Sequence, residues 1–356
     1  MSSSSYEELH VSRETSNRVT VGGNGRDDVS RETQTIAEVD HSPGSGSADA
    51  SADTPIEREA MRAMHVRNLD GQGWPRPAQT RVLTVANQKG GVGKTTSTVN
   101  IAAALALRGQ RVLVVDLDPQ GNASTALGVD HTVGTPSIYD VLLGGESFAD
   151  VLSAVELSSN LFCIPATIDL AGADIELTSQ VAREYRLQRA VRAHLAAAQQ
   201  DPAVALDYIF IDCPPSLGLL TLNALVAARE VLIPIQCEYY ALEGLAQLLS
   251  TVELVTSHLN PTLVVSTVLL TMYDSRTRLA DQVAAEVRSH FGDLVIDAVI
   301  PRNVRVSEAP GFGQTVITYD PGSRGAVGYL QAAEEIAHRR VTETAADAVD
   351  QGQGEQ

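Results

Sequence analysis

The chain has 356 residues, of which 44% are hydrophobic, so it is long enough to bury one large core and still carry unfolded segments. No apolar run approaches the roughly 18 residues that a membrane-spanning helix needs, and the N-terminus lacks the basic and apolar stretches of a secretory signal. The formal charge of −18 argues against nucleic acid as a partner, but part of the acid lies in the tails, so the net charge decides little.

Residues 1–78 are rich in Ser, Gly, Asp and Glu, and this composition predicts a disordered extension. A short helical pattern at 54–66 could form transiently or dock a partner, and we expect Trp74 to pack against the domain that follows. From Arg81 onward, apolar strand-like runs alternate with helical patterns. The predicted strands are 82–86, 111–115, 161–165, 208–211, 231–235, 263–270 and 295–300. The predicted helices are 95–108, 169–198, 217–228, 241–258, 277–291 and 325–339.

Strands that alternate with helices predict an α/β fold, with a doubly wound, mostly parallel sheet covered by helices on both faces. We expect one domain over residues 79–342, followed by a disordered acidic tail at 343–356. Ligands of such sheets bind beyond the carboxyl ends of the strands. Asp116, Asp212 and the loop 87–95 each follow a predicted strand, so we expect them to meet at that edge.

A glycine-rich loop joins the first predicted strand to the first predicted helix. It ends in Gly-Lys-Thr, as a P-loop does, but Gln88 stands where the common pattern Gly-x4-Gly-Lys-Ser/Thr has its first glycine. Its amides and the helix N-terminus favour a nucleotide phosphate, with Lys94 bridging the β- and γ-phosphates and the Thr95 hydroxyl on Mg²⁺. The predicted phosphate-binding residues are Lys89, Gly90, Gly91, Val92, Gly93, Lys94, Thr95 and Thr96. The fold is therefore expected to be of the P-loop NTPase type.

Lysine occurs at only two positions, Lys89 and Lys94, among the 26 Lys and Arg residues of the chain. A general preference for arginine explains the other cationic positions. It does not explain why both exceptions fall within one short loop. A compact ammonium and a planar guanidinium are not interchangeable, so we interpret both lysines as phosphate contacts.

Acidic residues follow two later strands. Asp118 could orient the attacking water, although its Asp-Pro-x-Gly run also predicts a simple turn, and both interpretations can hold. Asp212 ends a buried strand in a Walker B-like position and is expected near Mg²⁺. Cys213 is conceivable as a cluster ligand. However, Cys163, Cys213 and Cys237 lack metal-ligand spacing, so we interpret all three as reduced thiols of a cytoplasmic protein.

Five sequence blocks resemble the ParA/MinD family and, within it, chromosomal ParA proteins of the Soj type. The blocks are 87–96, 116–122, 212–216, 300–310 and 319–325. Lys89 resembles the signature lysine of the family's deviant Walker A motif, which contacts phosphate across a dimer interface. The resemblance therefore implies ATP as the nucleotide and a sandwich homodimer. It also implies that Lys89, Lys94 and Asp118 act in catalysis, Asp118 as the switch I acid, and that Pro301 and Asn303 lie near the adenine.

The same resemblance implies weak ATPase activity, non-specific binding of the dimer to duplex DNA, and stimulation by a ParB-type centromere-binding protein. It implies a cytoplasmic, nucleoid-associated protein. Binding to the DNA backbone requires basic side chains but no sequence readout. The candidates are Arg276, Arg278, Arg302, Arg305 and Arg324. The alternative is that these arginines are solvated and scattered over loops.

Three other functions fit the sequence less well. A MinD-like membrane ATPase would need a basic amphipathic C-terminal helix, whereas the last residues are acidic and poorly apolar. A bacterial tyrosine kinase of the P-loop type would carry a C-terminal tyrosine cluster, and no tyrosine follows Tyr329. A scaffold that binds nucleotide without hydrolysing it would not need Asp118. We therefore favour a DNA-segregation ATPase that does not bind membranes.

Overall fold

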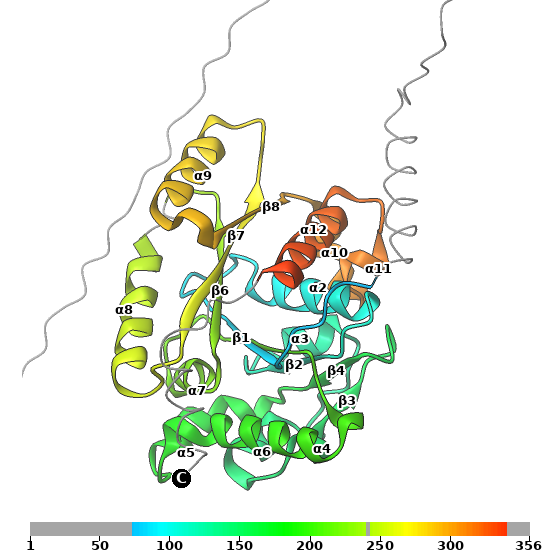
Figure 1. Cartoon of the computed structure of the whole chain (residues 1–356), viewed down its shortest axis with the longest axis vertical. Coiled ribbons are helices and arrows are strands. Elements are labelled where there is room, and N and C mark those ends of the chain that lie inside the picture. Colours follow the sequence, from blue (N-terminus) through cyan, green and yellow to red (C-terminus); the bar gives the residue numbers. More distant parts are fainter. Residues whose placement is uncertain (1–72, 240–242, 340–356) are drawn as a thin grey trace, which may run out of the picture. The chain divides into compact units, whose positions relative to one another are not determined.

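The computed structural model describes residues 73–239 and 243–339 (Figure 1). The helical pattern at 54–66, the rest of the extension up to residue 72 and the tail at 343–356 lie outside the described residues. Residues 73–80 form no helix or strand, but Trp74 packs against the domain, as expected. The Arg108 guanidinium lies over its ring at 5.4 Å, and the Gln110 side-chain amide donates to its carbonyl at 2.9 Å.

An eight-stranded sheet forms the centre of the domain, with the strand order β3-β4-β2-β5-β1-β6-β7-β8. The strands are β1 (Arg81–Val85), β2 (Val112–Asp116), β3 (Ser153–Ala154), β4 (Leu161–Ile164), β5 (Tyr208–Asp212), β6 (Glu230–Gln236), β7 (Val264–Tyr273) and β8 (Val295–Pro301). β3 pairs with β4 in antiparallel orientation, and every other neighbouring pair is parallel. The prediction of a mostly parallel sheet is confirmed.

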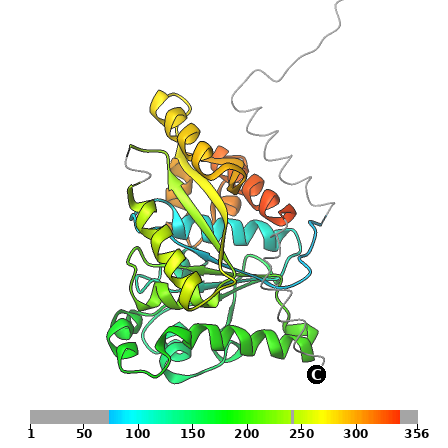
Figure 2. The same cartoon turned by 60° about the vertical axis from the view of Figure 1, so that its left-hand side comes forward.

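Helices cover both faces of this sheet (Figures 1 and 2). They are α2 (Lys94–Leu107), α3 (Asn122–Ala126), α4 (Phe148–Val151), α5 (Ala173–Thr178), α6 (Arg186–Gln200), α7 (Leu219–Ala227), α8 (Glu243–His258), α9 (Arg278–Phe291), α10 (Val304–Glu308), α11 (Val316–Tyr319) and α12 (Arg324–His338). Single turns of 3₁₀ or π-helix occur at Asp140–Gly144, Ile168–Gly172, Arg183–Tyr185, Pro202–Val204, Gly292–Leu294 and Ala309–Phe312. Within the described ranges, none of these helices combines the length and the hydrophobicity that crossing a lipid bilayer requires.

Side chains of the central strands alternate between two hydrophobic clusters. In β2, Leu113 and Val115 pack into the cluster that α6, α7 and α8 cover, whereas Val112 and Val114 pack into the cluster beneath α2 and α12. Every residue of β1, β2 and β5 is buried. Burial of each large aliphatic side chain stabilises the folded state by about 1.5–3 kcal/mol. The central strands are therefore stably packed and hold the ends of the loops in place.

A buried ion pair lies at the opposite end of the strands, where β1 and β6 begin. Arg81 donates from Nε and Nη2 to the two carboxylate oxygens of Glu230 at 2.8 and 2.7 Å. Its Nη1 also donates to the carbonyl of Ile336, at the end of α12. The bidentate geometry and the third hydrogen bond offset the desolvation of both charges. The pair thereby joins β1, β6 and α12.

The prediction of one long helix over 169–198 is wrong. The segment contains α5, two 3₁₀ turns and the first part of α6. Ala182 has φ 50°, a left-handed conformation that an α-helix cannot include. The side chain of Asn223, on α7, accepts from the Leu187 amide and donates to the Arg183 carbonyl. Because Asn223 supplies these hydrogen bonds, the Leu187 amide and the Arg183 carbonyl stay satisfied although the helix is interrupted at Ala182.

Candidate nucleotide site

The glycine-rich loop lies between β1 and α2, at the carboxyl edge of the sheet. Gly91 and Gly93 have φ of 75° and 90°, a region that disfavours residues with a Cβ. A Cβ added at Gly90 or Gly91 would meet no protein atom within 4 Å, so open space lies against the loop. The first amides of α2 have no acceptor within the helix and carry its positive end. The backbone amides of this loop and of the first turn of α2 are therefore arranged so that they can bind an anion.

Lys94 is the first residue of α2, and the residue is only 7% exposed. Its Nζ lies 3.4 Å from the carbonyl of Lys89, which places the ammonium under the loop. Burial lowers the pKa of Lys94, whereas the charges of Asp212, Cys213 and Asp118 act to raise it. Both predicted acids therefore act electrostatically on Lys94.

Asp212 ends β5, and neither of its carboxylate oxygens is exposed. The Thr98 hydroxyl donates to Oδ1 at 3.1 Å, while Oδ2 has no hydrogen-bond partner among the described residues. Burial and the neighbouring charge of Asp116 raise the pKa of Asp212 to about 8, and the hydroxyls of Thr95 and Thr98 and the charge of Lys94 oppose the shift. A buried carboxylate that lacks a partner beside the Thr95 hydroxyl is a donor set that fits Mg²⁺.

Asp118 lies in the loop after β2 and is 8% exposed. Its Oδ1 accepts a hydrogen bond from the Gln120 amide at 3.0 Å, and its carbonyl accepts one from the Gly121 amide at 2.9 Å. The Asp-Pro-x-Gly turn therefore forms, as the simple interpretation expects. The same turn holds the Asp118 carboxylate near Lys94, so the turn does not exclude a role in hydrolysis.

Lys89 lies on the same loop, and its side chain contacts an acid that follows β6. Its amide donates to the side chain of Asn87 at 3.0 Å, and Asn87 in turn donates to the carbonyl of Pro234 at 2.8 Å. The Lys89 ammonium pairs with Glu238 at 3.4 Å, with the two side chains 34% and 45% exposed. Sequence reasoning missed Glu238. Its only signal was an acid two residues beyond a buried strand.

Pro301 and Asn303 lie at the end of β8, three strands from β1 in the sheet order. Pro301 pairs with Tyr273 of β7, and the Asn303 side chain accepts from the Arg305 amide at 2.9 Å, which caps α10. Both residues are thus at the same carboxyl edge as the P-loop. Their predicted contact with the adenine stays a prediction.

All five candidate DNA-contacting arginines are exposed. Three of them hold ion pairs with neighbouring acids: Arg276 with Asp274 at 2.8 Å, Arg302 with Glu238 at 3.4 Å and Arg305 with Glu308 at 2.9 Å. Arg278 and Arg324 hold none within the part of the chain that the structure describes. Much of the positive charge on these loops is therefore locally neutralised.

The arginines lie on adjoining segments. The Arg302 amide donates to the Tyr273 carbonyl at 3.1 Å, which places Arg302 beside the loop that carries Arg276 and Arg278. Arg305 lies on α10 and Arg324 begins α12, and these two helices contact each other. The structure thus gathers the candidates into two groups near the ends of β7 and β8.

Comparison with known proteins decides the family. The family model described as an AAA domain matches residues 80–265. The sporulation initiation inhibitor protein Soj of Bacillus subtilis is 54% identical over 257 residues, which cover 72% of this chain and 98% of that protein. The chromosome partitioning protein ParA of Caulobacter vibrioides is 52% identical over 259 residues, covering 73% and 94%. This chain belongs to the ParA/Soj family of P-loop ATPases.

Solved structures agree with this ParA/Soj assignment at the level of the fold. A cobyrinic acid a,c-diamide synthase from Mycobacterium smegmatis, crystallised with ADP and magnesium, is 41% identical with a TM-score of 0.60. It covers 72% of this chain and 94% of its own length. MinD from Pyrococcus horikoshii, in complex with Mg-ADP, is 25% identical with a TM-score of 0.56, covering 72% and 96%. The P-loop NTPase fold expected from the sequence is confirmed.

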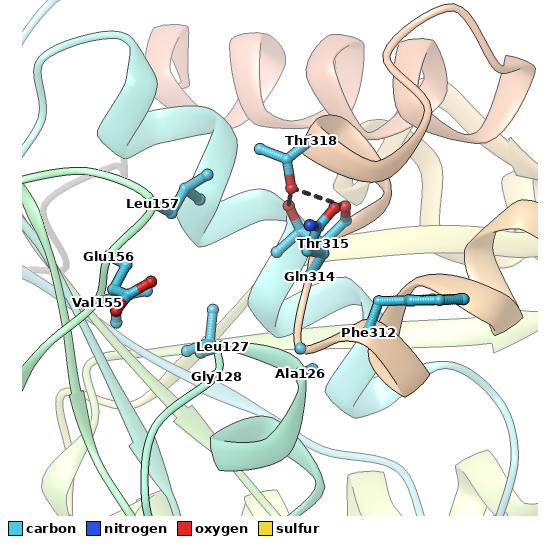
Figure 3. A pocket seen from close by; sticks show the side chains of 11 residues that line it. Ala126, Leu127, Gly128, Val155, Glu156, Leu157, Phe312, Gln314, Thr315 and Thr318 are labelled. Atoms are coloured by element: carbon cyan, nitrogen blue, oxygen red, sulfur yellow. Dashed lines mark hydrogen bonds between the residues drawn. The ribbon is translucent and has the colours of Figure 1, made fainter.

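A separate cavity of about 300 Å³ opens beside the ParA-type core (Figure 3). It is lined by the end of α3, by residues 155–157 and by residues 312–318. Phe312, Thr315 and Thr318 come from the segment before and within α11, and Leu157 lies across from them. No predicted nucleotide-binding residue lines this cavity. The predicted nucleotide site lies elsewhere, at the carboxyl ends of the strands around Lys94.

The three cysteines of this ParA-family chain are buried and form no disulfide. Burial raises the pKa of the thiols of Cys163, Cys213 and Cys237, which keeps them protonated. This agrees with the interpretation as reduced thiols.

Proposed function

We propose that this protein is an ATP-dependent DNA-segregation switch. ATP binding drives a sandwich homodimer that binds duplex DNA without sequence preference, and ATP hydrolysis, stimulated by a ParB-type centromere-binding protein, releases it. The observation that carries the proposal is the buried ammonium of Lys94, which lies beside Asp118 and Asp212 under a glycine cradle. The cycle would run in the cytoplasm on the nucleoid and would move chromosome or plasmid origins.

Each residue of the cradle has a distinct role in this proposal. The amides of Gly90–Gly93 and of the first turn of α2 bind the phosphates, and Lys94 bridges the β- and γ-phosphates. Mg²⁺, held by the Thr95 hydroxyl and near Asp212, would neutralise charge on the phosphates. Asp118 orients the water for attack. Intrinsic turnover should be weak, because the isolated protomer lacks the partner that stimulates it.

Lys89 is proposed to reach the nucleotide of the second protomer. In the single chain its ammonium pairs with Glu238, and both side chains are partly exposed. Such pairs contribute about 0–1 kcal/mol, so a phosphate with more charge than one carboxylate can replace Glu238. Dimerisation would then depend on the γ-phosphate, and hydrolysis would remove the charge that Lys89 contacts.

DNA binding is proposed to use the arginine loops at the ends of β7 and β8. Arg278 and Arg324 have no acidic partner within residues 73–239 and 243–339, and dimerisation would double the number of such sites. Contacts to phosphate alone give affinity without sequence specificity. Because counterions are released on binding, affinity should fall several-fold or more per doubling of salt concentration. The fall should be steeper when more phosphates are contacted.

The test is DNA binding with ADP, ATP and a non-hydrolysable ATP analogue, at two salt concentrations, for the wild type and for Lys89→Ala. The wild type should bind DNA only with ATP or the analogue, and only at low salt, and Lys89→Ala should lose both the dimer and DNA binding. Equal binding with ADP and ATP, or equal binding at both salt concentrations, would contradict the proposal.

The runner-up is a MinD-like membrane-positioning ATPase. Identity to the Soj relative is 54%, against 25% to the MinD structure from Pyrococcus horikoshii, and this difference favours the DNA-segregation branch. Co-sedimentation with anionic vesicles in the presence of ATP distinguishes the two. ATP-dependent sedimentation with vesicles but not with DNA would favour the runner-up.

A further inference from the structure

The loop that carries Asp118 is closed at its base by one buried carboxylate. Asp116, the last residue of β2, accepts the Asp118 amide on Oδ1 at 3.2 Å. Its Oδ2 accepts both the amide and the hydroxyl of Ser124, at 2.8 and 2.7 Å. Asp116 and Ser124 are completely buried. The segment between them is therefore a closed loop whose two ends meet at Asp116.

Ser124 joins this loop to the next strand of the sheet. Its hydroxyl has one proton, which it donates to Asp116, and its oxygen accepts the amide of Ala166 at 3.2 Å, two residues beyond β4. Without the hydroxyl, Asp116 would lose a donor and the Ala166 amide would lose its acceptor. Asp116 and Ser124 are inaccessible to solvent, so water cannot replace the lost hydrogen bonds. Each buried polar group would then remain unsatisfied, which costs free energy.

The tip of the loop is packed as well as its base. Gly121 has φ 63°, and a Cβ added there would meet His131 Nδ1 at 2.8 Å and the Ala166 carbonyl at 3.2 Å. The loop tip at Gly121 and the side chain of Ser124 thus both contact the backbone of Ala166. A shift of Ser124 relative to Ala166 would move the turn that holds Asp118.

We propose that Ser124 is a positioning residue for ATP hydrolysis, which holds Asp118 in place by tying Asp116 to the end of β4. This inference rests on the proposed function, because it requires that Asp118 act on the attacking water. Ser124 itself is completely buried, so we assign it no direct contact with the nucleotide or the attacking water. Its effect should fall on the rate of the chemical step and leave the affinity for nucleotide almost unchanged.

The experiment compares Ser124→Ala with Ser124→Thr and Ser124→Cys in the full-length protein. Displacing a catalytic group by about 1 Å costs on the order of 100-fold, so we expect kcat of Ser124→Ala to fall at least about tenfold. KM for ATP and the affinity of dimerisation with a non-hydrolysable analogue should stay within about twofold of the wild-type values. The reason is that Ser124→Ala removes no contact that binds the nucleotide in the ground state. Ser124→Thr keeps the hydroxyl and should restore most of kcat, and Ser124→Cys, with a weak S–H donor, should rank between the two.

The matched control is Thr84→Val. The Thr84 hydroxyl is equally buried on β1 and donates to the Ala224 carbonyl at 2.8 Å, away from the loop. It should keep the wild-type kcat even if it lowers the melting temperature. The inference is overturned if a folded Ser124→Ala hydrolyses ATP at the wild-type rate. It is also overturned if analogue binding falls in parallel with kcat, or if Ser124→Thr rescues nothing. A wild-type protein that binds but never hydrolyses ATP would instead refute the proposed function itself.

Discussion

Asp116 and Asp212 lie opposite each other at the ends of the paired strands β2 and β5, and neither side chain is exposed to solvent. Burial is the main cause that raises the pKa of Asp116 to about 6 and of Asp212 to about 8, and the charge of Asp116 adds to the shift at Asp212. Lys94 contributes an opposing positive charge at Asp212. Two buried carboxyls beside one ammonium leave the site short of positive charge, which a bound Mg²⁺ would supply.

The first prediction concerns stability against pH in the absence of nucleotide. Both pKa values are raised in the folded state, whereas an unfolded Asp titrates near about 4. Between about pH 4 and 8 the folded protein therefore holds protons that the unfolded chain has lost, and stability falls as the pH rises through this window. Asp212→Asn should flatten that fall. Melting temperatures from pH 5.5 to 8.5 test it, and identical slopes for the two proteins would contradict the assignment.

The second prediction is that Asp118→Ala slows hydrolysis and leaves ATP binding intact. Loss of a group that positions or deprotonates the attacking water costs about 10²–10⁴-fold in rate. The ATP-bound dimer should then persist on gel filtration. Asp130→Ala is the control, since Asp130 is exposed and, among the residues that the structure describes, accepts hydrogen bonds only within its own turn. An Asp118→Ala protein with wild-type turnover would show that this acid only shapes the turn.

The third prediction separates Lys89 from its ion-pair partner. Lys89→Ala should abolish ATP-dependent dimerisation, because the cross-protomer contact is lost. Glu238→Gln should instead tighten the dimer by up to about fivefold, because an exposed ion pair of about 0–1 kcal/mol no longer competes for Lys89. Analytical ultracentrifugation with a non-hydrolysable analogue measures both. If Glu238→Gln weakened the dimer as Lys89→Ala does, Glu238 would be a positioning residue for Lys89, not a competitor.

The fourth prediction concerns DNA. Arg278→Ala and Arg324→Ala should each lower the slope of log affinity against log salt by about 1, as expected for a lost phosphate contact. Asp274→Asn should strengthen binding, since it frees Arg276 from a bidentate partner. The control is Arg189→Ala, because Arg189 is exposed on α6 and belongs to neither group of candidate arginines. Equal losses for control and test variants would indicate only a general charge effect.

The fifth prediction tests the buried pair at the amino edge. Arg81→Met leaves Glu230 buried without its cation and should lower the free energy of unfolding by about 3–5 kcal/mol. The double variant Arg81→Met/Glu230→Met should recover most of that loss, since no unpaired charge remains. Urea titration measures both. A double variant as unstable as the single one would mean that the hydrogen bond from Arg81 to Ile336 matters more than the ion pair.

The phosphate loop could be predicted in detail from the sequence, because its function depends on backbone geometry that only a few residue types allow. Gly91 and Gly93 do take the left-handed conformations that glycine favours. The long helix over 169–198 could not be predicted correctly. Its break at Ala182 depends on hydrogen bonds from Asn223, which is far away in the sequence.

The sequence by itself determined the family, the order in which strands and candidate functional loops follow one another along the chain, and the lysine predicted to bind phosphate. Those features follow from local patterns: periodicity, turn residues and a lysine where arginine is otherwise used. Only the tertiary structure decided what each charged side chain meets. It paired Glu238 with Lys89 and placed Ser124 between the ends of β2 and β4. Such partners are set by how parallel strands converge at one edge, and sequence spacing carries no record of that convergence.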